Sequence, residues 1–305
     1  MDKKTFIACG LLTFAVSMQA QTKAGGIDQQ MMDKITAGSS STANRALANA
    51  IKTNAIDDLA RNFKKEGSFD THFSVETTKQ NIHNQKSSGR CWLFSGLNVL
   101  RSNFARNHKD TLRVELSHVY LSFHDQLEKA NLMLQGVIDN ANKPMDDPMV
   151  QFFFKSPIGD GGTFCGVADL VDKYGLVPME VMPESYSAEN TSRMAKIVSS
   201  KLREYGLELR KMVADKKSKA AIKARKIEML GNIYHILSLS LGEPVKTFTF
   251  AFKDKNGKQI GKEKTYTPQE FYKETVGGPL NGTFIMAMND PRRPYYKTYE
   301  IEYDR

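Results

Sequence analysis

Several patterns that mark common classes of protein are missing from this sequence of 305 residues. It has no internal hydrophobic run of transmembrane length, no internal repeat and no glycine-rich phosphate loop. Cysteine is scarce, with three residues, and no cluster of metal-ligating side chains has a credible spacing. These absences exclude a protein of many membrane spans, and we expect neither a metal ion nor another cofactor.

The composition is that of an ordinary globular protein. Hydrophobic residues make up 40% and charged residues 25% of the chain, which is typical of soluble domains. The length suffices for one large domain or two modest ones. Much of the formal net charge of +9 comes from residues 196–226, with eleven Lys or Arg and three acids. We favour a solvated helix face there over a basic surface for acidic peptides or nucleic acid.

The N-terminus resembles an export signal. Weakly basic residues precede the mostly apolar stretch Thr5–Met18, and Met18-Gln19-Ala20 before Gln21 looks like a cleavage site after Ala20. We expect a signal peptide over residues 1–20, a flexible lead-in over residues 21–44, and a secreted or periplasmic mature protein. Cys9 would be removed with the signal.

The most informative stretch is residues 84–95, which read Asn-Gln-Lys-Ser-Ser-Gly-Arg-Cys-Trp-Leu-Phe-Ser. A thiolate that attacks an amide carbonyl produces an oxyanion, which needs two hydrogen-bond donors. The backbone N–H of Cys91 can supply one, and the side-chain amide of Gln85 the other, if the loop turns tightly at Gly89. Apolar residues then recur at helical spacing, which predicts a helix over Cys91–Asn107 with one buried side. The N-terminus of that helix favours the thiolate form of the cysteine.

This stretch closely resembles the nucleophile segment of the bleomycin hydrolase and bacterial aminopeptidase C family of papain-like cysteine peptidases. Other runs that carry the resemblance are Glu115–Leu121, Asp172–Pro178 and Pro183–Tyr186. The resemblance covers residues 45–305. It implies an α+β papain-like fold with a helical insertion, peptide substrates, and a homo-oligomeric ring such as a hexamer. The competing interpretation is a buried structural cysteine beside a core tryptophan, but Gln85, Gly89 and Trp92 all agree with the catalytic one.

A second informative loop contains the pair Gly161 and Gly162. Glycines let another backbone approach closely. In papain-like enzymes a glycine pair at this place binds the extended main chain of the substrate, a form of strand addition. The resemblance therefore implies substrate contact by Gly161, Gly162 and Trp92. A plain turn before a helix over Phe164–Tyr174, ended by Gly175, is the alternative.

Further helices are predicted from apolar spacing and capping residues. Their expected bounds are Arg45–Glu66, stopped by Gly67, and Ser117–Leu134, followed by a charged helical region over residues 188–242. Thr267–Glu270 has the pattern of a capping box and predicts another helix start.

Strands are predicted in the last part of the chain, from alternating patterns and turn residues. Their expected bounds are Val245–Phe252, before a hairpin turn at Asp254–Gly257, then Thr283–Asn289 and Tyr295–Tyr303. We therefore divide the mature chain into a papain-like helical part (45–187), a basic helical insertion (188–242) and the start of a sheet part (243–305).

A cysteine peptidase also needs an imidazole to take the thiol proton, and an Asn or Asp to orient that imidazole. The six histidines are His72, His83, His108, His118, His124 and His235. None stands on a predicted strand before an apolar run with Asn or Asp just upstream, so we interpret each as structural or solvent-facing. In the resembled family the His and Asn come later in the chain. We therefore expect that this sequence is the N-terminal portion of a longer enzyme, with its sheet part truncated, and is inactive alone.

The leading hypothesis is a cysteine aminopeptidase that forms an acyl-enzyme on Cys91, with Gln85 as oxyanion donor. The resemblance alone implies that cleavage is restricted to the N-terminal residue of a peptide. The alternative is an inactive papain-like protein that binds peptides or acts as a scaffold. A nucleic-acid-binding role ranks third, because an export signal disfavours it. A disulfide between Cys91 and Cys165 would silence the nucleophile, so we expect Cys165 to be a small buried residue on a helix face.

Overall fold

The computed structural model describes residues 26–38, 41–62, 64, 70, 72–280 and 289–299. The expected signal peptide and residues 283–288 of an expected strand lie outside these ranges. The chain divides into two units, residues 1–74 and 75–305, and each is described by itself. Among the described residues, no helix combines the length and the apolar character needed to cross a membrane.

The first unit is built of short helices with no core among its described residues. They are α1 (Gln29–Thr36), α2 (Thr42–Thr53) and α3 (Ile56–Leu59), none of which buries a residue. Helix α1 lies within the segment expected to be a flexible lead-in, and Asp28 caps it by accepting from the N–H of Met31.

The prediction of one helix over Arg45–Glu66 is wrong. Helix α2 ends at Thr53, and Asn54 takes an extended backbone conformation. The Asn54 side-chain amide donates to the carbonyl of Ala50 (3.0 Å), which satisfies an end group of the helix and competes with its continuation.

The second unit is mainly helical, with small sheets. Its elements are α4 (Cys91–Asn107), β1 (Leu112–Arg113), α5 (His118–Asp139), α6 (Pro148–Lys155), α7 (Phe164–Tyr174), α8 (Tyr186–Glu189), α9 (Ser192–Ala214), α10 (Lys219–Leu241), β2 (Phe248–Phe250), β3 (Lys253–Asp254), β4 (Lys264–Tyr266) and α11 (Pro268–Val276). Among the described residues, β1 pairs antiparallel with β3, and β2 with β4. This combination is an α+β architecture, as predicted.

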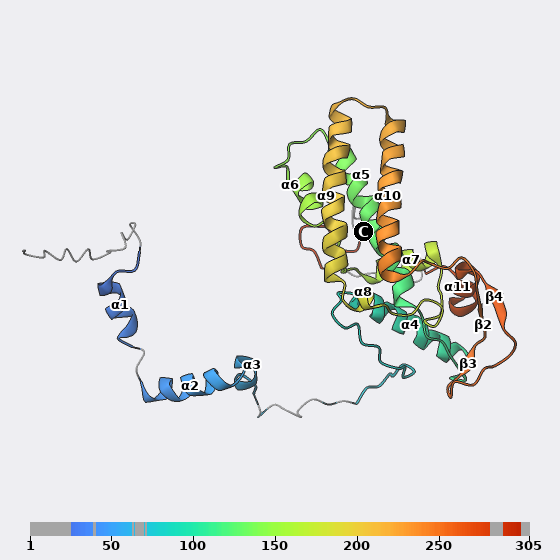
Figure 1. Cartoon of the computed structure of the whole chain (residues 1–305). Coiled ribbons are helices and arrows are strands. Elements are labelled where there is room, and N and C mark those ends of the chain that lie inside the picture. The colour runs from blue at the N-terminus through green and yellow to red at the C-terminus, as the bar shows by residue number, and fades with distance from the viewer. Residues whose placement is uncertain are drawn as a thin grey trace, which may run out of the picture. The chain divides into compact units, whose positions relative to one another are not determined.

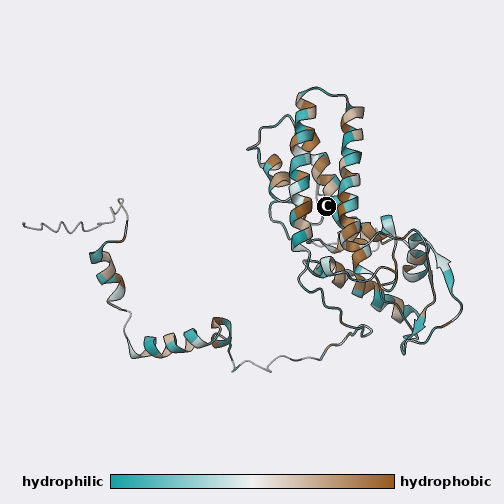
Figure 2. Ribbon diagram, viewed as in Figure 1, coloured by the Kyte–Doolittle hydropathy of each residue, from teal (hydrophilic) through white to brown (hydrophobic). Residues whose placement is uncertain are grey.

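Helices α5, α9 and α10 form a bundle that stands on α4 and α7. In Figure 1, α9 and α10 are long neighbours joined at their far end, with α5 beside them and α4 across the base. Figure 2 shows the apolar surfaces of these helices turned toward one another. A continuous apolar cluster runs from Leu97 of α4 through Phe123 of α5 to Leu237 of α10, all fully buried. Helix α4, which begins at Cys91, is therefore held by the main core of the unit.

The helix predictions in this unit are confirmed or lengthened. Helices Cys91–Asn107 and Phe164–Tyr174 have the predicted bounds. The helix expected over Ser117–Leu134 runs on to Asp139, and Ser117 caps it. The capping box is present, since Thr267 and Glu270 each accept from the other's backbone N–H.

The strands are shorter than predicted. Only Phe248–Phe250 of the alternating run forms a strand, with both Phe side chains buried and Thr249 exposed between them. The turn at Asp254–Gly257 is present, with the Gly257 N–H donating to the Asp254 carbonyl. The expected strand at Tyr295–Tyr303 is wrong for residues 295–299, because they are largely exposed and no described strand pairs with them.

Candidate active site

The thiol of Cys91 stands at the first residue of α4. Its side chain is exposed, and Sγ lies 4.0 Å from the carbonyl oxygen of Gly89. The first N–H groups of a helix have no partner within the helix. Within the described residues, no acceptor is bonded to the backbone N–H of Cys91. That N–H is therefore available as an oxyanion donor next to the sulfur.

The loop before Cys91 is folded back on itself. Ser88 Oγ donates to the carbonyl of Gln85 (2.7 Å), and Gln85 Nε2 donates to the carbonyl of Ser88 (2.6 Å). Lys86 takes a positive φ of 53° at the turn. A side-chain amide has two hydrogens, so Gln85 keeps one for an oxyanion after the bond to Ser88.

Arg90, just before the helix, anchors the same loop from inside the protein. It is 2% exposed, and its guanidinium forms two hydrogen bonds with the Glu184 carboxylate, at 2.8 and 3.3 Å. Arg90 Nε also donates to Ser88 Oγ (3.0 Å). A buried guanidinium needs such pairing because an unpaired buried charge is costly. Sequence reasoning missed this pair: both residues lie in the runs that carry the family resemblance, but nothing local joins them.

Asp160 connects the loop before Cys91, residues 85–90, to a second loop. We call residues 159–162 the glycine loop. Its Oδ2 accepts from the backbone N–H of Gly89 (2.9 Å) and from the hydroxyl of Thr191 (2.5 Å). Its main-chain oxygen accepts from the indole Nε1 of Trp92 (2.6 Å). A Cβ on Gly162 would come within 2.6 Å of the Trp92 ring. The fold therefore brings Cys91 and its Gln85 loop, Trp92 and the glycine pair together.

Three histidines contact groups other than the thiol. His118 is 1% exposed and stacks on Phe94 at 3.7 Å, and burial is the main cause that lowers its pKa to about 3. His124 stacks on Tyr174 at 3.8 Å, and burial lowers its pKa to about 4. His83 Nε2 lies 2.9 Å from a Glu115 carboxylate oxygen.

Two further histidines are exposed, His72 and His235, and His108 Nδ1 bonds the carbonyl of Phe104 at 2.8 Å. In the part of the chain that the structure describes, no hydrogen bond joins any of the six to Cys91.

Cys165 is the second residue of α7 and is half-buried. Both Cys91 and Cys165 are free thiols, so the nucleophile is not locked in a disulfide. A search of the described residues finds no group of His, Cys, Asp or Glu side chains that could hold a metal ion.

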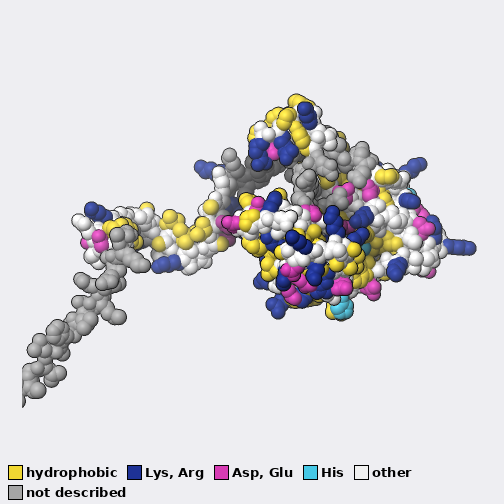
Figure 3. All heavy atoms as spheres, turned by 90° about the horizontal axis from the view of Figure 1, so that it is seen from above, with side chains coloured by type: hydrophobic (Ala, Val, Ile, Leu, Met, Phe, Trp, Pro, Cys, Tyr) yellow, Lys and Arg dark blue, Asp and Glu magenta, His cyan; other side chains and the backbone are white. Residues whose placement is uncertain are grey.

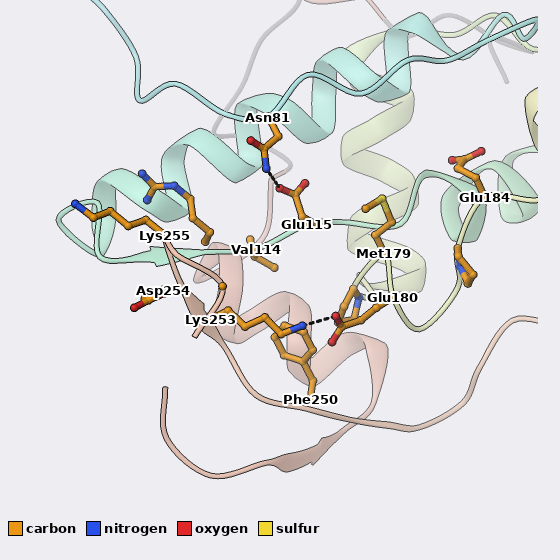
Figure 4. A pocket seen from close by; sticks show the side chains of 14 residues that line it. Asn81, Val114, Glu115, Met179, Glu180, Glu184, Phe250, Lys253, Asp254 and Lys255 are labelled. Atoms are coloured by element: carbon orange, nitrogen blue, oxygen red, sulfur yellow. Dashed lines mark hydrogen bonds and ion pairs between the residues drawn. The ribbon is translucent and has the colours of Figure 1, made fainter. Parts of the chain in front are cut away.

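A pocket of about 570 Å³ lies beside the site but does not include the thiol. Figure 4 shows it between β1, the segment around Met179 and β3, with Lys253 paired to Glu180 and Asn81 bonded to Glu115. Neither Cys91 nor the glycine loop lines it. Glu184, the ion-pair partner of Arg90, is one of the lining residues.

Comparisons with known proteins agree on one family. The model of the peptidase C1-like family matches residues 26–305. The chain is 39% identical to an aminopeptidase C from Lactobacillus delbrueckii subsp. lactis, over 84% of the chain and 57% of the relative. It is 40% identical to the bleomycin hydrolase of Homo sapiens, over 73% of the chain and 50% of the relative.

A solved structure is similar as well. PepW from Lactobacillus rhamnosis superposes with a TM-score of 0.75 and 34% identity, over 85% of this chain and 58% of that one. The chain thus spans about half the length of its relatives.

Proposed function

This chain belongs to the peptidase C1-like family, and we propose that it carries the nucleophile of a cysteine aminopeptidase. The family resemblance stated from the sequence and the papain-like fold are thereby confirmed. The observation that carries the proposal is the exposed Cys91 thiol at the start of α4, with a free backbone N–H and the Gln85 amide held nearby. Relatives named aminopeptidase C and bleomycin hydrolase support it.

The proposed chemistry follows from these groups. The Cys91 thiolate attacks the carbonyl carbon of the peptide bond, forming a C–S bond and an oxyanion that accepts from the Cys91 N–H and the Gln85 amide. The oxyanion collapses, the C–N bond breaks, and the amine leaves with a proton from an imidazolium. Water then hydrolyses the thioester and regenerates the thiol.

We propose that the imidazole of this scheme and its Asn lie beyond residue 305. Two facts support this: His118 is buried and stacked on Phe94 while His83 pairs with Glu115, and the chain spans only about half of each relative.

Substrate contact is proposed at Gly162 and Trp92, with Gly161 beside them. Within the described residues, the N–H and C=O of Gly162 have no hydrogen-bond partner. A free N–H and C=O on one residue are what an extended peptide needs to add as a strand. The Trp92 ring closes one side of this residue.

Assembly and location are proposed from the sequence. We propose a homo-oligomeric ring from the family resemblance, and export from the pattern of residues 1–20. The mass of the native particle and the N-terminal residue of the protein in its source cells test these two points.

The test of function uses the complete enzyme and two substrates, an aminoacyl 4-nitroanilide with a free amino group and its N-acetylated counterpart. We expect hydrolysis of the first substrate only, and a loss of at least about 1,000-fold in Cys91→Ala. The matched control is Cys165→Ala, which removes the other free thiol and retains activity. Undiminished hydrolysis in Cys91→Ala would refute the proposal.

The second candidate is a papain-like protein that binds peptides without cleaving them. It is favoured by the lack of a hydrogen bond between Cys91 and any described histidine. Saturable peptide binding by the complete protein, with no product over the range pH 6–8, would be its signature.

A nucleic-acid role is disfavoured by the charges of residues 196–226. Lys201 pairs with Glu204, Lys211 with Asp215, and Arg225 with Glu208. On the face seen in Figure 3, basic and acidic side chains are interspersed over the helices instead of forming a basic patch. Failure to bind DNA at low salt would exclude this role.

A further inference from the structure

Lys129 of α5 directs its ammonium group at the glycine loop. Nζ lies 2.8 Å from the carbonyl oxygen of Gly159, 2.6 Å from that of Gly161 and 2.7 Å from Asp125 Oδ2. An ammonium has three hydrogens, so each has an acceptor. The side chain is 14% exposed, and hydrogen bonds from a charged donor in such a place are stronger than neutral ones.

Asp125 and Gln126 complete a closed set of hydrogen bonds with Lys129 and the loop. Gln126 Nε2 donates to Asp125 Oδ2 (3.1 Å) and to the Gly159 carbonyl (3.0 Å). Both are also among the three acceptors of Lys129. Asp125 is 8% exposed. Burial is the main cause that raises the pKa of Asp125 to about 6, while Lys129 acts in the opposite direction. Lys129 therefore opposes the effect of burial and favours the charged form of the carboxylate.

Three successive carbonyls of the loop are occupied in this way. Lys129 holds those of Gly159 and Gly161, and the Trp92 indole holds that of Asp160. Lys129 Nζ also lies 5.5 Å from the centroid of the Trp92 ring. The carbonyl of Gly162 is the first in the loop without a protein partner among the described residues.

We propose that Asp125 and Lys129 are a positioning pair, which fixes the glycine loop against Trp92 and leaves Gly162 as the residue that presents its main chain to the substrate. This inference rests on the proposed function. Neither side chain touches the reacting atoms. The pair acts through the loop, so its loss weakens substrate binding more than it slows the chemical step.

The first experiment measures kcat and KM of the complete enzyme with Lys129→Met, which keeps the length of the side chain but removes its donors. We expect KM to rise about 10-fold with kcat within about threefold of the parent, because binding common to the ground and transition states is lost. Lys129→Arg retains donors and charge, and should recover most of the lost binding. Unchanged KM in Lys129→Met would overturn the proposal.

The matched control is Lys211→Met. Lys211 also pairs with an aspartate four residues away, at 2.8 Å, but on an exposed face of α9 far along the chain from the loop. It should leave KM unaltered. The double variant Asp125→Asn/Lys129→Met removes both charges and the buried unpaired carboxylate. Its KM should match that of Lys129→Met, and a return to the parent KM would show that the single change acted by general destabilisation.

A second readout does not depend on catalysis. Trp92 is the only tryptophan of these 305 residues, and its emission is isolated by subtracting the spectrum of the matching Trp92→Phe protein. Lys129→Met should shift this emission, and Lys211→Met should not. If the complete protein proves to have no Cys91-dependent hydrolysis, the proposed function fails while an emission shift still supports the positioning pair. An unshifted emission overturns the pair whether or not the protein is active.

Discussion

The nucleophile loop, residues 85–90, and the glycine loop, residues 159–162, face each other across the site but are held in different ways. The nucleophile loop is bonded within itself, through Gln85, Ser88 and Arg90. The glycine loop is held by side chains of α5, about thirty residues earlier, and by Trp92. Its only large side chain is Asp160, since its other members are glycines.

Because the two loops are held differently, we expect the nucleophile loop to affect the stability of the protein and the glycine loop to affect peptide binding. The nucleophile loop ends at Arg90, whose buried guanidinium pairs with the partly exposed carboxylate of Glu184. Loss of that carboxylate leaves a buried charge unpaired and should destabilise the whole unit. The glycine loop is held from outside by the largely buried side chains of Asp125, Gln126 and Lys129, so damage there should change how a peptide is bound before it unfolds the protein.

The largest effect is expected from Glu184→Ala. This change leaves the Arg90 guanidinium buried without its carboxylate, and the free energy of unfolding should fall by about 3–5 kcal/mol. Urea denaturation measures it. Glu180→Ala is the matched control, because its pair with Lys253 is on the surface, and it should cost less than about 1 kcal/mol. Equal losses in the two variants would contradict the central role of the buried pair.

The next largest effect is expected from acid, which should lower the free energy of unfolding through His118. The His118 ring is stacked on Phe94. Its pKa is about 3 in the folded protein, against an ordinary value of 6.5. A lowered folded pKa gives stability that is present above pH 6.5 and is lost as pH falls toward 3, because the unfolded chain binds the proton first.

Between pH 7 and pH 5 we therefore expect a loss of about 2 kcal/mol from His118, and a similar loss from His124, whose folded pKa is about 4. His118→Phe keeps the stacking on Phe94 and should remove the part of this dependence on pH that His118 contributes. Unfolding free energies measured across the range decide it, and an unchanged slope in His118→Phe would count against the buried neutral imidazole.

The smallest effect distinguishes the two glycines of the glycine loop. A Cβ at Gly162 would lie 2.6 Å from the Trp92 ring, whereas one at Gly161 meets nothing within 4 Å. Gly162→Ala should therefore cost about 1–3 kcal/mol of stability through overpacking, and Gly161→Ala less than about 1 kcal/mol. Thermal unfolding of the two variants is the measurement. A reversed order would mean that the ring moves aside freely.

Local sequence signals were sufficient for the elements that depend on neighbours in the chain. The spacing of Leu93, Leu97 and Phe104 predicted helix α4 with its correct bounds, and Thr267 with Glu270 predicted the start of α11. The same reasoning failed for the helix expected over residues 45–66, where Asn54 ends α2. It failed again for residues 295–299, because a strand exists only if another strand pairs with it.

By itself, the sequence determined the position of the thiol at a helix start, the Gln85 and Gly89 loop, the glycine pair and the family. These features depend on residue types at short, fixed spacings, which can be read directly from the sequence. The tertiary structure alone decided that Arg90 meets Glu184, that Asp160 meets Gly89, and that Lys129 takes the Gly161 carbonyl. Charges and hydrogen bonds between distant segments have no period in the sequence, so only the packing of α4, α5 and their loops could select these partners among many residues of the same kind.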